Sequence, residues 1–71
     1  MEARKKQTTI EYYADPLSIR LLGAVNVPAN RAEEYGKAFG KLFCKAHGLN
    51  SVEAVLIDED GEETDRRTIY R

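Results

Sequence analysis

The chain has 71 residues and a formal net charge of −1, with 11 lysines and arginines set against 12 aspartates and glutamates. A chain of this length forms one domain that buries about 60% of its unfolded surface, so self-association is a common source of extra burial. The single cysteine excludes an internal disulfide framework, no apolar run approaches the roughly 20 residues that cross a bilayer, and no apolar segment follows the N-terminal charges. These features predict a small cytoplasmic protein.

The N-terminal part of the chain divides into an arm and a first strand. Residues 1–7 are charged and lack periodicity, which predicts a flexible arm ahead of a single domain at 8–71. Residues 8–13 have the β-branched and aromatic content of a strand, and the turn-forming pair Asp15-Pro16 follows them.

The second predicted strand is a long run of alternating hydrophobicity at residues 17–27. Alternation with period two indicates a strand with one buried face. The apolar odd positions are Leu17, Ile19, Leu21, Val25 and Val27. Leu22 and Ala24 make the other face partly apolar, which suggests that a loop or another subunit covers some of it.

A helix is predicted between Asn30 and Gly48. Pro28 ends the preceding strand because it lacks a backbone donor, and Asn30 with Glu33 three residues later has the spacing of a capping box. Gly48 follows the last periodic residue, in the position of a left-handed C-cap.

Residues four apart form three rows on this helix. They are a small row (Ala32, Gly36, Gly40, Cys44), an aromatic row (Tyr35, Phe39, Phe43) and a cationic row (Lys37, Lys41, Lys45). Each glycine inside a helix costs roughly 1 kcal/mol relative to alanine, so Gly36 and Gly40 predict the close approach of another backbone. That backbone belongs either to the sheet or to a second subunit.

Two further strands are predicted after the helix, at residues 51–57 and 64–70. Asp60-Gly61 between them is the signal of a two-residue type I′ hairpin. In that register acidic residues face one another across the two strands, so a longer loop with a bulge is the alternative.

The predicted order is β-β-α-β-β, an α+β two-layer sandwich with one helix on a four-stranded mixed or antiparallel sheet. The helix is long enough to be a crossover, which sets the second and third strands parallel and favours the strand order 1-2-3-4. The predicted core residues are Leu21, Val25, Phe39, Leu42, Phe43, Val55 and Ile57. The sheet face without the helix is left to solvent or to a partner.

Candidate chemical groups are few. Cys44 and His47 are neighbours on the helix surface, but no third residue orients them and a zinc site needs two more ligands. We therefore interpret Cys44 as a core residue and His47 as a C-terminal cap. The acidic stretch around Gly61 lacks the spacing of an EF-hand, because its glycine comes too early. The sequence predicts no catalytic residue, cofactor or metal site.

The densest charge feature is a set of six carboxylates around Gly61, which we call the acidic hairpin: Asp58, Glu59, Asp60, Glu62, Glu63 and Asp65. Because these carboxylates repel one another, we predict that they contact a basic surface of another protein. Self-association is predicted at Gly36, Gly40, Leu22 and Ala24. The sequence thus favours a homodimeric, non-enzymatic protein-interaction module that acts as an inhibitor, adaptor or accessory factor.

The alternative is a small nucleic-acid-binding regulator. Aromatic and basic residues on one sheet face would stack on bases and pair with phosphates, and the candidates are Tyr12, Tyr13, Tyr70, Arg20, Arg66 and Arg67. The slightly acidic chain and the acidic hairpin both oppose this function, because they repel phosphate.

Overall fold

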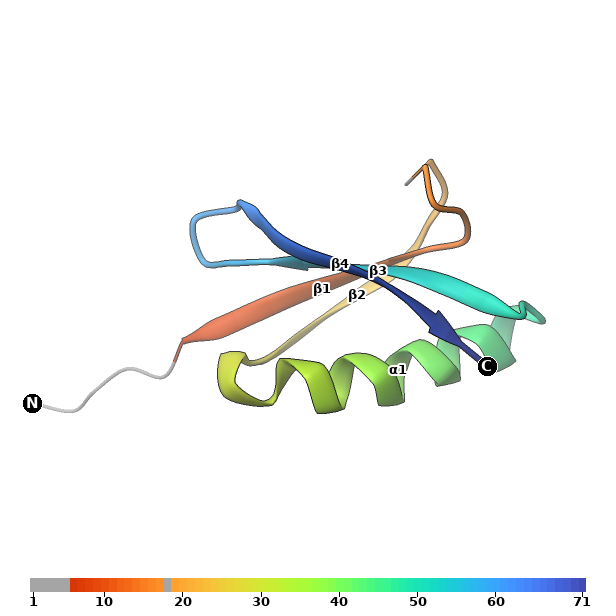
Figure 1. Ribbon diagram of the computed structural model, residues 1–71, viewed down its shortest axis with the longest axis horizontal. Helices are drawn as coiled ribbons and strands as arrows, with labels where there is room; N and C mark the ends of the chain where they lie inside the picture. Colours follow the sequence, from red (N-terminus) through yellow and green to blue (C-terminus); the bar gives the residue numbers. More distant parts are fainter. Residues whose placement is uncertain (1–5, 18) are drawn as a thin grey trace, which may run out of the picture.

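One helix lies along one face of a four-stranded antiparallel sheet (Figure 1). The computed structural model describes residues 6–17 and 19–71. The elements in chain order are β1 (Gln7–Tyr13), β2 (Leu21–Pro28), a 3₁₀ turn (Ala29–Arg31), α1 (Ala32–His47), β3 (Ser51–Ile57) and β4 (Glu63–Tyr70). The predicted α+β sandwich and its β-β-α-β-β order are therefore confirmed. Most of the predicted arm at 1–7 lies outside the described residues, and Gln7 belongs to β1.

The strand order is β2-β1-β3-β4, so the predicted order 1-2-3-4 is wrong. β1 pairs antiparallel with both β2 and β3, and β3 pairs antiparallel with β4. The helical connection from β2 passes over β1 and places β3 against the free edge of β1. β2 and β3 consequently run in the same direction, as predicted, but they are not neighbours. This order places the apolar residues Ile10 and Tyr12 of β1 at the centre of the sheet, where both are fully buried.

β2 begins at Leu21, so the predicted strand start at residue 17 is wrong. Leu17 and Ile19 lie in the preceding loop and are each 77% exposed. The loop is closed by the Asp15 carboxylate, which accepts the backbone N–H groups of Leu17 and Ile19 at 3.0 and 3.2 Å. This local turn competes with the strand conformation that the alternation predicts. Leu21 is 54% exposed, so its predicted core position is also wrong.

The small row of α1 faces the sheet, and its four members Ala32, Gly36, Gly40 and Cys44 are the buried residues of the helix. The close approach predicted at the two glycines is made by the sheet of the same chain, and the atoms nearest to the glycines belong to sheet side chains, where another backbone was predicted. A β-carbon on Gly40 would lie 2.7 Å from Cγ2 of Ile69, and one on Gly36 would lie 3.3 Å from Cδ1 of Ile10. The backbone of α1 can approach the sheet this closely because these positions lack side chains.

The core lies between this row and the inner face of the sheet. It is formed by Ile10, Tyr12, Val27, Ala32, Cys44, Val52, Ala54 and Ile69. Of the predicted core residues, Val55 is buried, while Val25, Phe39, Phe43 and Ile57 are half-buried. Leu42 is 59% exposed, so its predicted core position is wrong. The aromatic row flanks the core because the small row occupies the centre of the contact.

The predicted C-terminal cap of α1 is present in the structure, but the predicted N-terminal cap is not. The capping box at Asn30 is wrong: Asn30 lies in the 3₁₀ turn, and the N-cap is Arg31, which makes no capping side-chain hydrogen bond. The C-cap is confirmed, because Gly48 has φ 65° and the Leu49 N–H donates to the Cys44 carbonyl at 2.8 Å.

The β3–β4 hairpin has the longer loop, and the two-residue type I′ turn is wrong. The Asp58 N–H donates to the Glu62 carbonyl at 2.9 Å, and the Gly61 N–H donates to the Asp58 carbonyl at 3.0 Å. Gly61 has φ 84°, the left-handed conformation that closes a three-residue loop. The register shifts at Leu56 and Ile57, which places the predicted bulge beside the loop.

Candidate functional site

Two carboxylates of the acidic hairpin accept hydrogen bonds that stabilise its loop. The Asp58 carboxylate accepts the backbone N–H groups of Asp60 and Glu62 at 2.9 and 3.0 Å. The Glu59 carboxylate accepts the Gln7 N–H at 3.0 Å and so connects the loop to the start of β1. Two of the six predicted contact residues therefore have a structural role in the loop.

Two more of these carboxylates pair with arginines of β4. Glu63 lies 3.2 Å from Arg66, and Asp65 lies 2.9 Å from Arg67. The hydrogen bond from Arg67 holds the pKa of Asp65 below its ordinary value. Within the described residues, Asp60 and Glu62 are the members of the acidic hairpin whose side chains accept no hydrogen bond or ion pair.

The sheet face opposite the helix carries a closed polar network. Arg66 pairs with Glu53 at 3.7 Å, and the Thr68 hydroxyl donates to the same carboxylate at 2.9 Å. Arg66 also donates to the Pro16 carbonyl at 3.2 Å, so the loop before β2 reaches this face. The Tyr13 hydroxyl donates to Glu11 at 2.6 Å, and this bond raises the pKa of Tyr13.

The residues predicted to bind nucleic acid do not share one face. Tyr12 is fully buried under the helix, where its hydroxyl donates to the Gly36 carbonyl at 2.6 Å. Arg67 also points to the helix side, while Tyr13 and Arg66 lie in the network on the opposite face. The predicted single aromatic and basic surface is therefore wrong.

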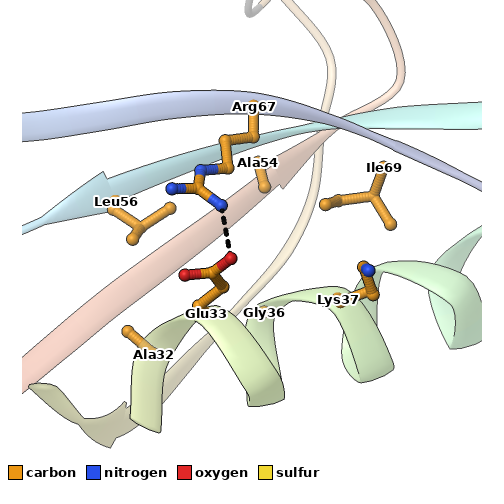
Figure 2. A pocket seen from close by; sticks show the side chains of 8 residues that line it. All are labelled: Ala32, Glu33, Gly36, Lys37, Ala54, Leu56, Arg67 and Ile69. Atoms are coloured by element: carbon orange, nitrogen blue, oxygen red, sulfur yellow. Dashed lines mark ion pairs between the residues drawn. The ribbon is translucent and has the colours of Figure 1, made fainter. Parts of the chain in front are cut away.

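A small cavity lies between the first half of α1 and strands β3 and β4. Figure 2 shows Arg67 reaching from the sheet towards Glu33 of α1, with 3.1 Å between Nη1 and Oε2. The other lining residues are Ala32, Gly36, Lys37, Ala54, Leu56 and Ile69. The volume of about 60 Å³ is far below the roughly 300 Å³ of a small-molecule site. The ion pair across its mouth links helix and sheet.

Cys44 is a core residue, as predicted. It is fully buried, its Sγ lies 3.7 Å from the Ile69 carbonyl, and burial raises the pKa of its thiol. His47 is exposed and stacks on Phe43, with 6.2 Å between the ring centroids. The described part of the chain holds no cluster of three or more His, Cys, Asp or Glu side chains arranged to ligate a metal.

The edge strand β2 has a composition unlike that of the other edge strand, β4. Its eight residues, Leu-Leu-Gly-Ala-Val-Asn-Val-Pro, include no charged side chain. β4 contains two acidic and two basic residues among its eight. Charged side chains on an edge strand discourage pairing with another chain, and an uncharged edge lacks that protection. Of the two sheet edges, β2 is therefore the one open to a further strand.

Ala24 and Asn26 are the residues in the regular part of β2 that direct both N–H and C=O outward. The Ala29 N–H donates to the Lys6 carbonyl at 2.9 Å, which identifies this pair as hydrogen-bonded. Opposite residues of antiparallel strands alternate between hydrogen-bonded and non-bonded pairs, and the β1–β2 register begins at the adjacent residue, Pro28, and runs without a break to Val25. The amide groups of Val25 thus face β1, while those of Ala24 and Asn26 face outward.

An open apolar groove runs beside β2 on the helix side of the sheet. It is lined by Val25, Phe39, Leu42, Phe43 and Ala46, with a volume of about 320 Å³. Gly23 admits the Phe43 ring, because a β-carbon at Gly23 would lie 2.8 Å from Cζ of that ring. Leu42 stands at the rim with 59% of its surface exposed. We call the outward edge of β2 together with this groove the β2 surface.

The predicted self-association residues divide between the interior and the β2 surface. Gly36 and Gly40 are buried against the sheet, Leu22 is half-buried at the irregular end of β2, and Ala24 is exposed on that strand. Sequence reasoning missed the groove and Asn26. The available signal was the run of ten uncharged residues at 21–30 in a chain that is 32% charged.

No family model, curated protein or solved structure matches this chain. Across residues 6–17 and 19–71, no helix has the length and hydrophobicity that spanning a lipid bilayer requires. The surfaces described above are therefore the basis for assigning a function.

Proposed function

We propose that this protein is a non-enzymatic protein-interaction module that acts as an inhibitor, adaptor or accessory factor by occupying the surface of another polypeptide. The observation that carries the proposal is the β2 surface. It combines an uncharged strand edge with an apolar groove whose rim residue, Leu42, is 59% exposed.

Strand addition is the binding mode that such a surface supports. An added strand would satisfy the outward amide groups of Ala24 and Asn26, and apolar side chains of that strand or its neighbours would fill the groove. The backbone bonds contribute affinity and the groove contributes selectivity for apolar residues. A surface that served only solubility would carry charge at this edge, as β4 does.

We propose the acidic hairpin as a second contact, made by the two carboxylates that have no partner within residues 6–17 and 19–71. Asp60 and Glu62 are exposed at the loop tip, where they attract a basic region of a partner and accelerate association at low ionic strength. The other four carboxylates are held by partners in the same chain and contribute less to an external field.

Nucleic acid fits this molecule less well than protein. Arg66 and Arg67 each pair with two carboxylates, so phosphate would have to compete with bonds already made. Binding of nucleic acid would also fall steeply with salt, which gives a simple control for any complex that is found.

The proposal is tested by photo-crosslinking from defined positions. A benzophenone amino acid replaces Leu42 in the groove, Asp60 at the hairpin tip, or Ala38 as an exposed helix control, and each protein is irradiated in extract of its native host. We expect protein adducts from position 42 or 60, insensitive to nuclease and absent from position 38. Adducts of equal yield from all three positions, or none from 42 and 60, would refute the proposed function.

A further inference from the structure

The outward N–H and C=O groups of β2 are placed symmetrically about Val25, which allows the strand to pair with an identical copy of itself. Ala24 and Asn26, whose amides face outward, lie one residue to each side of Val25. If a second β2 runs antiparallel with Val25 opposite Val25, Ala24 of each copy stands opposite Asn26 of the other. Each of these two pairs exchanges two backbone hydrogen bonds, because both members direct N–H and C=O outward. The edge is thus complementary to itself.

We propose that the polypeptide bound at the β2 surface is a second copy of this chain, paired antiparallel through β2 about a two-fold axis at Val25. The result is a dimer with one continuous eight-stranded sheet and both helices on the same face. This inference rests on the proposed function and specifies the partner at that surface.

The absence of charge on β2 favours its own copy as the partner. In a two-fold interface, residues near the axis meet the same residues of the other subunit, so any charge there would face a like charge. β2 has none, and Asn26 is held on the open sheet face by its side-chain contact with the Thr9 hydroxyl at 2.6 Å. No charged side chain of the strand therefore opposes the approach of an identical strand, and Pro28, which lacks a backbone N–H, lies at the end of the strand away from the axis.

The side chains near the axis also suit this pairing. Val25 lies on the helix side, so the two Val25 side chains become cross-strand neighbours, a pair of β-branched residues of the kind that stabilises sheets. The two grooves then join into one apolar trough, with Leu42 of each helix at its sides. An eight-residue strand is roughly 27 Å long, so the edge and the groove together present an extended contact surface.

The second edge of the sheet explains why association would stop at two copies. β4 carries Asp65, Arg66 and Arg67 in ion pairs with side chains of its own subunit. The Arg66 N–H, which this register directs outward, already donates to the Asp65 carboxylate at 2.8 Å. This edge is charged and one of its outward N–H groups is already bonded, so the dimer closes instead of extending into a fibre.

The first experiment measures mass and amide protection together on the full chain. Sedimentation over a range of protein concentrations gives the dimer dissociation constant, and hydrogen exchange by NMR follows each backbone amide. We expect a dimer in which the Ala24 and Asn26 amides exchange slowly, while the outward Thr68 amide of β4 exchanges fast. The protection at Ala24 and Asn26 should disappear as the sample is diluted below the dissociation constant.

Charge variants at Asn26 then test the two-fold axis. The two copies of position 26 are diagonal neighbours across it, within reach of long side chains at about 7–8 Å. We expect N26K and N26E each to weaken the dimer on the order of tenfold or more, and an equal mixture of the two to restore it as a heterodimer. The exposed Asn50 supplies matched controls, N50K and N50E, which should leave the dimer unchanged.

The outcomes separate this inference from the proposed function. A monomer at all concentrations, or a dimer whose Ala24 and Asn26 amides exchange freely, overturns the β2 pairing. A mixture of N26K and N26E that remains monomeric overturns it as well. In each of these cases the proposed function still stands if position 42 crosslinks to a different protein, and it fails separately if neither position 42 nor position 60 gives a specific adduct.

Discussion

Replacing Gly40 with alanine tests whether the small row of α1 packs against the sheet as the structure shows. The new β-carbon would lie 2.7 Å from Cγ2 of Ile69 and 2.9 Å from its Cβ and Cγ1. Carbon atoms in favourable contact are about 3.5–4.0 Å apart, so helix and strand must separate by up to roughly 1 Å. The clash involves the branched part of a buried side chain, which cannot simply rotate away.

The expected loss of stability follows from two opposing terms. Overpacking of a close contact costs about 2–3 kcal/mol, and alanine regains about 1 kcal/mol because it is a better helix former than glycine. The net loss is about 1–2 kcal/mol, which corresponds to a fall of roughly 4–16 °C in the melting temperature of a domain of this size. The variant should remain folded.

Gly36→Ala is the matched control on the same row. Its β-carbon would meet Cδ1 of Ile10 at 3.3 Å, the end of a flexible side chain that can move by a few tenths of an ångström. The gain in helix propensity offsets this smaller cost, so stability should stay within about 1 kcal/mol of wild type. Urea and thermal unfolding at one fixed protomer concentration compare the three proteins. Equal stability of Gly40→Ala and Gly36→Ala would contradict the tight packing of Gly40 against Ile69.

The remaining predictions concern Tyr12, Leu42 and the acidic hairpin. Burial raises the pKa of Tyr12 to about 12 from its ordinary 10, so the hydroxyl ionises in the unfolded chain before it ionises in the folded one, and the free energy of unfolding should fall between pH 10 and 12. Tyr12→Phe should remove this part of the pH dependence of unfolding. The same fall in the variant as in wild type would contradict the prediction. Leu42→Gln should alter monomer stability by less than about 0.5 kcal/mol because this side chain is 59% exposed, whereas a large loss in chemical denaturation would show that it packs in the core. The double variant Asp60→Asn, Glu62→Gln should keep the wild-type melting temperature and slow partner association at low salt in stopped-flow measurements. Asp58→Ala should lower the free energy of unfolding by about 1 kcal/mol, because two backbone N–H groups lose their acceptor. Equal association rates for the neutralised and wild-type loops would limit the acidic hairpin to a structural role.

Local signals in the sequence were sufficient to predict the four strands and the helix and their order along the chain. Gly48 ends α1 with a left-handed residue, and residues 51–57 form a strand with the predicted bounds. These features depend on neighbouring residues alone, because a C-cap or a strand period involves groups only a few positions apart. Where local signals competed, the prediction was wrong: the Asp15 turn replaced the first part of the predicted second strand.

The face of α1 that packs on the sheet could not be derived from the helix sequence. The small row and the aromatic row have the same spacing of four, and hydrophobicity favours the aromatic one. The small row packs against the sheet because Gly40 leaves room for the Ile69 side chain and the Gly36 carbonyl accepts a hydrogen bond from the Tyr12 hydroxyl. That choice leaves Leu42 at the surface.

In the candidate site too, some features can be read from the sequence and others depend on contacts made in the folded structure. The six acidic side chains around Gly61 are visible in the sequence, but their partners are loop backbone N–H groups for Asp58, the Gln7 N–H of β1 for Glu59, and arginines of β4 for Glu63 and Asp65. Only the folded structure shows which carboxylates are held in this way and that Asp60 and Glu62 remain unpaired among the described residues. The uncharged run at 21–30 is equally visible in the sequence, yet a central strand has the same composition as an unprotected edge. It becomes an edge because the connection through α1 places β3 beside β1, and strand order is set by contacts between residues far apart in the chain.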